Sequence, residues 1–143
     1  SGSKVAVSFC ENGAASGTGL VYAPNFSVGV NLFFDIVRAA APALGLGFSG
    51  RIVERHHAQK KDAPSGTAVA MKKTLGAEVE ITSIREGDTV GMHVLLLDSE
   101  NDTIMLTHDA KSRRGFAEGA VRAAEWLAGK RGFHEFKDVL KEL

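Results

Sequence analysis

The chain is organised around the stretch Glu54-Arg-His-His-Ala-Gln-Lys-Lys-Asp-Ala-Pro-Ser-Gly66, which is followed directly by Thr67. Two adjacent histidines and two lysines stand before a proline turn, where a strand gives way to a helix. Imidazoles that titrate near neutrality, fixed positive charges and free backbone amides are thus gathered in one short segment. These groups can bind a small anion, particularly a carboxylate, and pass it a proton. We therefore interpret this stretch as the active site.

The helix that starts after the turn provides the anion-binding part. Ser65, Gly66 and Thr67 form its first turn, where the backbone amides lack partners within the helix and lie at the positive end of its dipole. Glycine lets a ligand approach the backbone, and the threonine hydroxyl can donate to it. Taken alone, these three residues favour an ordinary capped helix. The preceding histidines shift the balance towards a binding site.

The two histidines and the first lysine provide the proton and a further positive charge. If residues 52–57 form a strand, His56 and His57 face opposite sides of it, so we predict no shared metal ion. A histidine that faces the pocket can deliver a proton, an effect worth about 10²–10⁴ in rate. Lys60 would hold a second carboxylate or stabilise developing negative charge. Either histidine alone is more simply explained as a structural residue.

The spacing of apolar residues predicts an α+β fold, in which a mixed, mostly antiparallel sheet carries helices on one face. A short apolar run at residues 4–10 predicts a remnant strand at the N-terminus, before a glycine-rich segment and a second apolar run at 20–23. The other predicted strands are residues 51–55, 78–83, 90–97 and 103–108, and the predicted helices are 27–41, 65–75, 115–130 and a short one within 132–143.

One segment matches a nucleotide-binding pattern in the wrong place. Gly45-Leu-Gly-Phe-Ser-Gly50 fits G-x-G-x-x-G letter for letter. That pattern binds a dinucleotide only when it lies between a strand and the helix that follows. Here a predicted helix precedes it and a predicted strand follows it. We interpret the segment as a loop.

Composition limits the classes of function. The 143 residues suit one domain, and 44% of them are hydrophobic and 24% charged. The 17 basic and 17 acidic side chains balance, which argues against a nucleic-acid binder. We see no apolar run near the roughly 18 residues of a membrane span and no secretory signal, and Cys10 is the single cysteine. We therefore expect a cytoplasmic protein without membrane or nucleic-acid partners.

Beyond these arguments, His56-His-Ala-Gln-Lys-Lys-Asp-Ala-Pro-Ser-Gly-Thr67 closely resembles the signature of dihydrodipicolinate reductase, an enzyme of lysine biosynthesis in bacteria and plants. Three further segments are similar to parts of that family, so the resemblance covers about residues 21–140. Residues 24–31 look like the hinge between its two domains, 83–93 like its core strands, and 108–120 like the return segment that closes its site.

The resemblance implies a role for each matching residue. The reaction would be hydride transfer from NADH or NADPH to a cyclic unsaturated dicarboxylate, with protonation of the neighbouring atom. By resemblance, His56 is the proton donor and Lys60 polarises the imine of the substrate. The substrate carboxylates would be held by His57, Ser65, Gly66, Thr67 and Arg113, and Asn25 and Phe26 would lie at the hinge near the cofactor.

The chain departs from the family at its beginning. Members of the family start with a complete nucleotide-binding domain, whereas about 24 residues precede Asn25 here, and no suitably spaced glycine-rich loop follows Val7. We expect residues 1–20 to be a tag remnant, a residual strand and a linker. Residues 21–143 would form the substrate-binding and oligomerisation domain with its return helix. On this interpretation the chain is truncated or engineered, has doubtful activity and does not bind NADH or NADPH itself.

The expected partners are a small dicarboxylate and further copies of the chain. In the family the helix at 116–127 packs on the nucleotide domain, so its apolar face would need another partner here. The resemblance also implies pairing of sheets, and we expect a homo-oligomer, a tetramer or dimer. Two alternatives stay open, namely a non-catalytic dicarboxylate-binding module and a purely structural oligomerisation domain.

Overall fold

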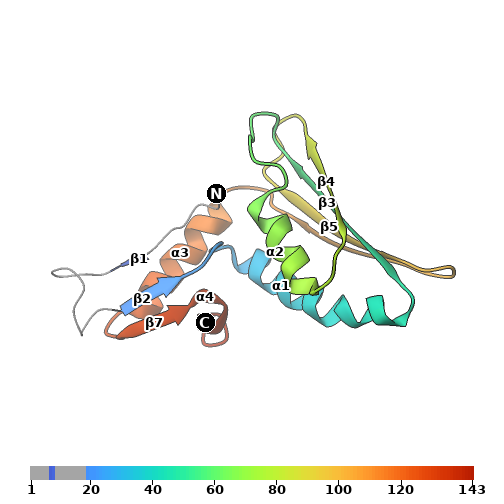
Figure 1. Cartoon of the computed structure of the whole chain (residues 1–143). Helices are drawn as coiled ribbons and strands as arrows, with labels where there is room; N and C mark the ends of the chain where they lie inside the picture. The colour runs from blue at the N-terminus through green and yellow to red at the C-terminus, as the bar shows by residue number, and fades with distance from the viewer. Residues whose placement is uncertain (1–6, 9–18) are drawn as a thin grey trace. The chain divides into compact units, whose positions relative to one another are not determined.

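The computed structural model describes residues 7–8 and 19–143, which form two compact units (Figure 1). The first unit is Leu32–Ser112, and the second comprises the described residues up to Asn31 together with Arg113–Leu143. The predicted tag remnant, Cys10 and almost all of the glycine-rich linker lie outside the described residues. The division into a linker and a domain at residue 21 therefore stays a prediction.

The first unit is built on a four-stranded sheet with the order β4-β3-β5-β6. β3 pairs with β4 in parallel and with β5 in antiparallel orientation, and β5 and β6 form an antiparallel hairpin. The predicted mixed, mostly antiparallel sheet is thus confirmed. The strands are β3 (Ser49–His56), β4 (Glu80–Arg85), β5 (Met92–Asp98) and β6 (Thr103–Asp109).

Helices α1 (Val28–Ala40) and α2 (Gly66–Leu75) supply the core on one face of this sheet. Phe33 and Val37 of α1 and Met71 of α2 are buried in one cluster with residues of the strands, such as Ile52 and Leu95. Because side chains alternate along a strand, Glu54 and His56 fall on the same helix-covered face as Ile52. This periodicity places a polar site at the end of an apolar core.

The ends of the helices follow the sequence. Ser27 Oγ accepts from Val30 N at the start of α1, at 3.3 Å, and the α-helix ends just before Pro42. The chain then continues as the 3-10 helix η1 (Ala41–Leu46), turns at Gly47 with φ 94° and enters β3. The order at the G-x-G-x-x-G match is therefore helix, turn, strand, as the sequence predicted.

The statement that no apolar run nears the length of a membrane span needs a correction. Val28–Leu46 forms a continuous helical run of 19 residues with a mean hydropathy of 1.3, which is long and apolar enough to cross a membrane. Core helices of globular proteins pass the same test, and this run contributes Phe33 and Val37 to the core of the first unit. Its length is therefore weak evidence for a membrane span.

The second unit contains a three-stranded sheet and two helices. β2 (Gly19–Tyr22) lies between β1 (Val7–Ser8) and β7 (Gly132–Glu135), antiparallel to the first and parallel to the second. The strand predicted within residues 4–10 is thus described at Val7–Ser8, whereas β7 was not predicted. α3 (Arg114–Leu127) and α4 (Phe136–Val139) complete the unit, so the short C-terminal helix is confirmed.

The apolar face of α3 is covered within its own unit. Ala123 and Leu127 are buried in one cluster with Val21 of β2 and with Phe136 and Val139 of α4. The expectation that this helix needs an outside partner is therefore wrong for this face. Gly119 explains the close packing, since a Cβ there would lie 1.7 Å from the Phe26 carbonyl oxygen.

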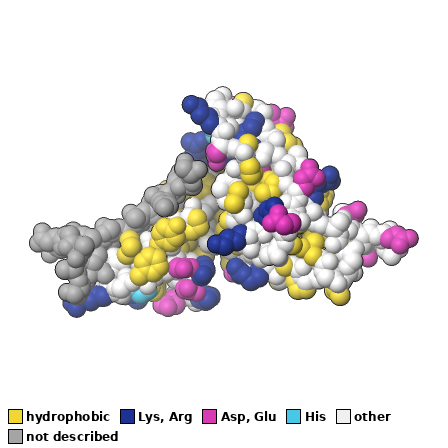
Figure 2. All heavy atoms as spheres, in the orientation of Figure 1, with side chains coloured by type: hydrophobic (Ala, Val, Ile, Leu, Met, Phe, Trp, Pro, Cys, Tyr) yellow, Lys and Arg dark blue, Asp and Glu magenta, His cyan; other side chains and the backbone are white. Residues whose placement is uncertain are grey.

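Charged side chains of both signs are spread over the visible surface, with hydrophobic side chains between them (Figure 2). This mixture agrees with the formal charge of zero.

Candidate functional site

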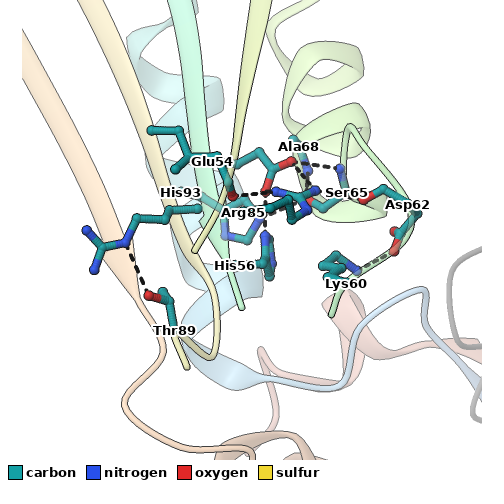
Figure 3. A network of polar contacts seen from close by, with 11 residues as sticks. Glu54, His56, Lys60, Asp62, Ser65, Ala68, Arg85, Thr89 and His93 are labelled. Carbon is teal, nitrogen blue, oxygen red and sulfur yellow. Dashed lines mark hydrogen bonds and ion pairs between the residues drawn. The ribbon is translucent and has the colours of Figure 1, made fainter. Parts of the chain in front are cut away.

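The predicted active-site stretch spans the end of β3, a loop and the start of α2. His56 ends β3, Lys60 lies in the loop, and Ser65 caps α2, so these three residues belong to one part of the first unit (Figure 3). Gly66 and Thr67 form the first turn of α2. The loop contains a cis peptide bond between Ala63 and Pro64.

The strand argument for the two histidines needs a correction. β3 ends at His56, so His57 lies beyond the strand and does not alternate with it. His56 is buried, whereas His57 is half-buried and its Nδ1 lies 3.2 Å from Gln59 Oε1. Backbone bonds from Glu86 N to His56 O and from Ala58 N to Gly87 O still hold this part of the chain against the residues that follow β4.

A fully buried carboxylate, that of Glu54, lies at the centre of the site (Figure 3). Arg85 Nη1 donates to Glu54 Oε2 at 2.9 Å, and Nη2 donates to Oε1 at 2.7 Å. The backbone amide of Ser65 donates to Oε1 at 3.2 Å, and His56 Nδ1 lies within hydrogen-bonding distance of Oε2. The carboxylate therefore connects the strand, the helix start and the predicted proton donor.

These partners keep Glu54 ionised. Burial by itself would raise the pKa of the carboxyl group, but hydrogen bonds from Arg85, Ser83 and His56 outweigh it and lower the pKa to about 2. The bidentate guanidinium is the strongest kind of partner for a carboxylate. A negative charge is thus present beside His56 at neutral pH.

His56 is in an environment that favours its neutral form. Burial lowers its pKa most, the hydrogen bond and charge of Glu54 raise it, and the charges of Lys60 and Arg85 lower it. The net direction is downward from 6.5. Its ring meets that of His93 edge-on, with centroids 5.0 Å apart.

His93 links the sheet to the helix start. Its Nε2 lies 3.1 Å from Ser65 Oγ, and the same oxygen accepts from Ala68 N at 3.2 Å to cap α2. Burial lowers the pKa of His93 most, the charge of His56 lowers it further, and it reaches about 4. Neutral His93 can donate Nε2–H to Ser65, which would leave the serine hydroxyl proton for a ligand.

The loop that carries Lys60 is fixed at two points. Lys60 Nζ donates to Asp62 Oδ1 at 2.7 Å, and this bond lowers the pKa of the aspartate. Arg85 Nη2 donates to Asp62 O, also at 2.7 Å. The same arginine therefore holds both Glu54 and the loop that carries the lysine.

The site also contains a group of residues of metal-ligating types. Ligand atoms of Glu54, His56 and His93 all lie within 4.8 Å of one another. Both oxygens of Glu54 already accept from Arg85, and a guanidinium at this distance repels a divalent cation. We therefore interpret the group as a hydrogen-bonded network.

The remaining predicted residues belong to the second unit. Arg113 immediately precedes α3, so its predicted contact with the substrate stays a prediction. Asn25 Oδ1 accepts from Ser27 N at 2.8 Å, and Phe26 is buried with its ring 5.0 Å from that of Phe136. Both side chains thus have structural roles at the start of α1, and their predicted role at the cofactor is not tested.

Sequence reasoning assigned no role to Glu54, Arg85 and His93. Glu54 lies two residues from Ile52 and two from His56 in one strand, so the three side chains face the same side. This alternation already indicates a buried carboxylate, and a buried carboxylate needs a partner. The partner was missed because strand β4 was predicted at 78–83 and extends to Arg85, which pairs with His56 in the sheet.

Fold and site define a two-unit α+β chain with a buried carboxylate–histidine network beside a helix N-terminus. The family described as "Dihydrodipicolinate reductase, C-terminus" matches residues 29–140. The chain belongs to this family.

Several curated relatives of this chain share one name. 4-Hydroxy-tetrahydrodipicolinate reductase of Neisseria meningitidis serogroup B is 39% identical, over 89% of this chain and 56% of the relative. The enzymes of the same name from Ralstonia nicotianae and Thermosipho africanus are 40% and 42% identical, over 93% and 86% of this chain and 59% and 57% of the relatives. The chain thus spans a little over half the length of these relatives.

A solved structure supports the fold. The structure titled "Dipicolinate bound Dihydrodipicolinate reductase from Paenisporosarcina sp. TG-14" aligns with a TM-score of 0.68 and 23% identity, over 83% of this chain and 54% of that one. The predicted α+β class and the resemblance to this family are therefore confirmed.

Proposed function

We propose that this chain forms the substrate-binding part of a reductase that acts on a small cyclic dicarboxylate in lysine biosynthesis. The observation that carries the proposal is that His56 and Ser65 are joined through one carboxylate, so a proton donor stands beside a helix N-terminus. The name shared by the relatives supports the reaction class.

Two features of the first unit would bind the substrate. The N-terminal amides of α2 and the Thr67 hydroxyl would hold one carboxylate, since a helix N-terminus favours an anion. Lys60 would attract negative charge on the substrate, while its own carboxylate partner Asp62 is half-exposed and can exchange. His57 would complete the grip within this unit. The substrate contact of Arg113 and the extent of the substrate-binding domain, residues 21–143, stay predictions from the family resemblance.

His56 would deliver the proton. Its lowered pKa makes the imidazolium a stronger acid than free histidine, which helps it release a proton to the substrate. A bound dianion would in turn raise the pKa of His56 and load the proton when substrate arrives.

The hydride would come from NADH or NADPH, as the resemblance to the family implies. The two residues predicted near a cofactor do not fit that role as free contacts, because the Asn25 amide oxygen is bonded and Phe26 is buried. We therefore derive no step through the cofactor, and we propose that this chain binds dicarboxylate without binding nucleotide. We also propose that it acts in the cytoplasm, as a biosynthetic enzyme would.

Calorimetric titration with pyridine-2,6-dicarboxylate, with and without NADH or NADPH, tests this function. We expect dicarboxylate binding that nucleotide does not alter. Thr67→Val keeps the shape of the side chain but removes the hydroxyl donor, and it should weaken binding about 10-fold, the size of one hydrogen bond to a charged group. Thr82→Val, at an exposed position of strand β4, is the matched control and should bind as the wild type does.

Two other outcomes would favour the alternatives. Affinity that increases with nucleotide would show a working cofactor site and hence a complete enzyme. Absence of dicarboxylate binding in the folded protein would overturn the proposal and favour a structural oligomerisation domain.

A further inference from the structure

We propose that Glu54, clamped by Arg85, is a positioning residue that fixes His56 as the Nδ1–H tautomer, so that Nε2 is the only ring atom that exchanges a proton with a bound dicarboxylate. The proton exchange rests on the proposed function, whereas the tautomer is a property of the protein without ligand. All of the contacts involved lie within the first unit.

The position of the carboxylate is fixed from several sides. Glu54 is fully buried, and the guanidinium of Arg85 bonds both of its oxygens, at 2.9 and 2.7 Å. Arg85 is itself held by bonds of 2.7 Å to the carbonyl oxygens of Ile84 and Asp62. A planar bidentate pair restricts both translation and rotation of the carboxylate. Glu54 Oε2 is therefore a fixed acceptor.

A fixed carboxylate determines the tautomer of its histidine neighbour. An ionised carboxylate can only accept hydrogen bonds, so the nearby His56 Nδ1 must carry the hydrogen. In the neutral ring the other nitrogen, Nε2, is then an acceptor, and in the imidazolium it carries the proton that can be released. Release breaks the Nε2–H bond and leaves its electron pair on the ring, while Nδ1–H stays bonded to Glu54.

The residue beside Nε2 of His56 is a glycine, Gly91. An added Cβ at Gly91 would lie 2.9 Å from His56 Nε2 and 3.2 Å from Cδ2. A side chain at this position would clash with the edge of the ring that carries Nε2, and the glycine avoids this clash. The opposite edge is occupied by Glu54, so the two ring nitrogens have different surroundings.

The same carboxylate also holds the anion-binding end of α2. Glu54 Oε1 accepts from the backbone amide of Ser65, the residue that caps this helix. Arg85 fixes the loop between His56 and Ser65 through Asp62. One ion pair thus sets both the proton donor and the place where a carboxylate would bind, which a proton transfer between them requires.

Histidine-ring NMR tests the tautomer directly, through long-range ¹H–¹⁵N spectra of the ligand-free protein between pH 5 and 9. His56 should show the Nδ1–H pattern. In Glu54→Gln, which keeps the shape of the side chain, the amide can donate to Nδ1, so the ring should change towards Nε2–H. Its apparent pKa should also fall, because the carboxylate that favours the charged ring is lost.

Glu86→Gln is the matched control. Glu86 is an exposed carboxylate that pairs with Arg55 at 3.2 Å, and its loss should leave the ring pattern of His56 unchanged. The same Nδ1–H pattern in Glu54→Gln would overturn the proposal, as would an Nε2–H pattern in the wild type. If Glu54→Gln does not fold, the ring spectra of the wild type and of Arg85→Lys test the proposal in its place. The lysine keeps the positive charge but cannot form the bidentate bond to Glu54.

Dicarboxylate titration separates this inference from the proposed function. Wild-type protein that binds pyridine-2,6-dicarboxylate should do so with a pH dependence set by His56, and Glu54→Gln should shift that profile to lower pH. An unshifted profile would overturn the positioning role. If the wild-type protein binds no dicarboxylate, the proposed function is overturned. The histidine-ring spectra would still show which tautomer His56 adopts.

Discussion

At the residue scale, the site depends on a charge with no access to water. A buried carboxylate is tolerated only when hydrogen bonds and an opposite charge replace its hydration, as Arg85 and the Ser65 amide do for Glu54. Such a pair adds little net stability compared with apolar residues, but removal of one partner leaves the other buried and unpaired. The arginine is therefore more important for stability than its number of contacts suggests.

Arg85→Met should lower the free energy of unfolding by about 3–5 kcal/mol, because it leaves Glu54 buried without its positive partner. Urea denaturation of the two proteins measures the difference. Arg55→Met is the control, since Arg55 pairs with Glu86 at an exposed position and should cost less than about 1 kcal/mol. Equal losses for the two variants would show that burial of the pair does not matter.

The histidines predict that acid destabilises the protein. The pKa of His93 is about 4 in the folded protein against 6.5 for the free side chain, so the unfolded chain binds more protons between these values. Stability is then complete above pH 6.5 and is lost as the pH falls towards 4, by about 3 kcal/mol for this residue. The lowered pKa values of His56 and His108 act in the same direction.

Denaturation midpoints measured from pH 7 to pH 4 check this dependence. His93→Gln should reduce the slope of stability against pH, because the group that takes up the proton on unfolding is absent. Thr107→Ser, a change without a titratable group on the neighbouring strand, should keep the wild-type slope. A slope that His93→Gln leaves unchanged would contradict the assignment.

At the element scale, helix α2 is defined by its two ends. Ser65 caps the first turn, and Gly76 closes the helix with φ 65°, a backbone conformation that favours glycine. The serine oxygen also bonds to His93, so one hydroxyl connects the helix to the sheet. This arrangement couples the stability of the helix start to the geometry of the site.

Ser65→Ala should cost about 1–2 kcal/mol in unfolding free energy, since it removes the cap and leaves His93 Nε2 without this partner. Thermal and urea unfolding measure the loss, and dicarboxylate titration should show weaker binding. Thr74→Ala, which removes a hydroxyl bond to Ala70 O near the other end of α2, is the control and should cost less. Equal costs would mean that the cap has no special role.

The sequence predicted elements better than it predicted the pairing between them. Local signals, such as the serine and glycine caps of α2 and the polar turn of the β5–β6 hairpin, were sufficient because they depend on neighbours in the chain. β7 was missed because its four residues contain Gly132 and largely exposed side chains, and its partner β2 lies over a hundred residues away. The Glu54–Arg85 pair was missed for the same reason, since parallel strands bring together residues whose sequence spacing gives no signal.

At the scale of the whole molecule, the first unit has one sheet face that its helices do not cover. α1 and α2 contribute their core residues to the face of Ile52 and Leu95. The register of the strands places Val53, Leu96 and Met105 on the other face, and Met105 is 63% exposed. Exposed apolar side chains on this face favour association, so we keep the prediction of a homo-oligomer, a tetramer or dimer.

Analytical ultracentrifugation at working concentration tests this prediction, and we expect a mass of two or four chains. The double variant Leu96→Glu/Met105→Glu should shift the mass to that of one chain, because like charges would then oppose each other across a symmetric interface. Val69→Glu is the matched control, since Val69 is 50% exposed on α2, and it should leave the mass unchanged. A monomeric wild type would rule out the oligomer, and a double variant that stays assembled would show that the copies associate through another surface.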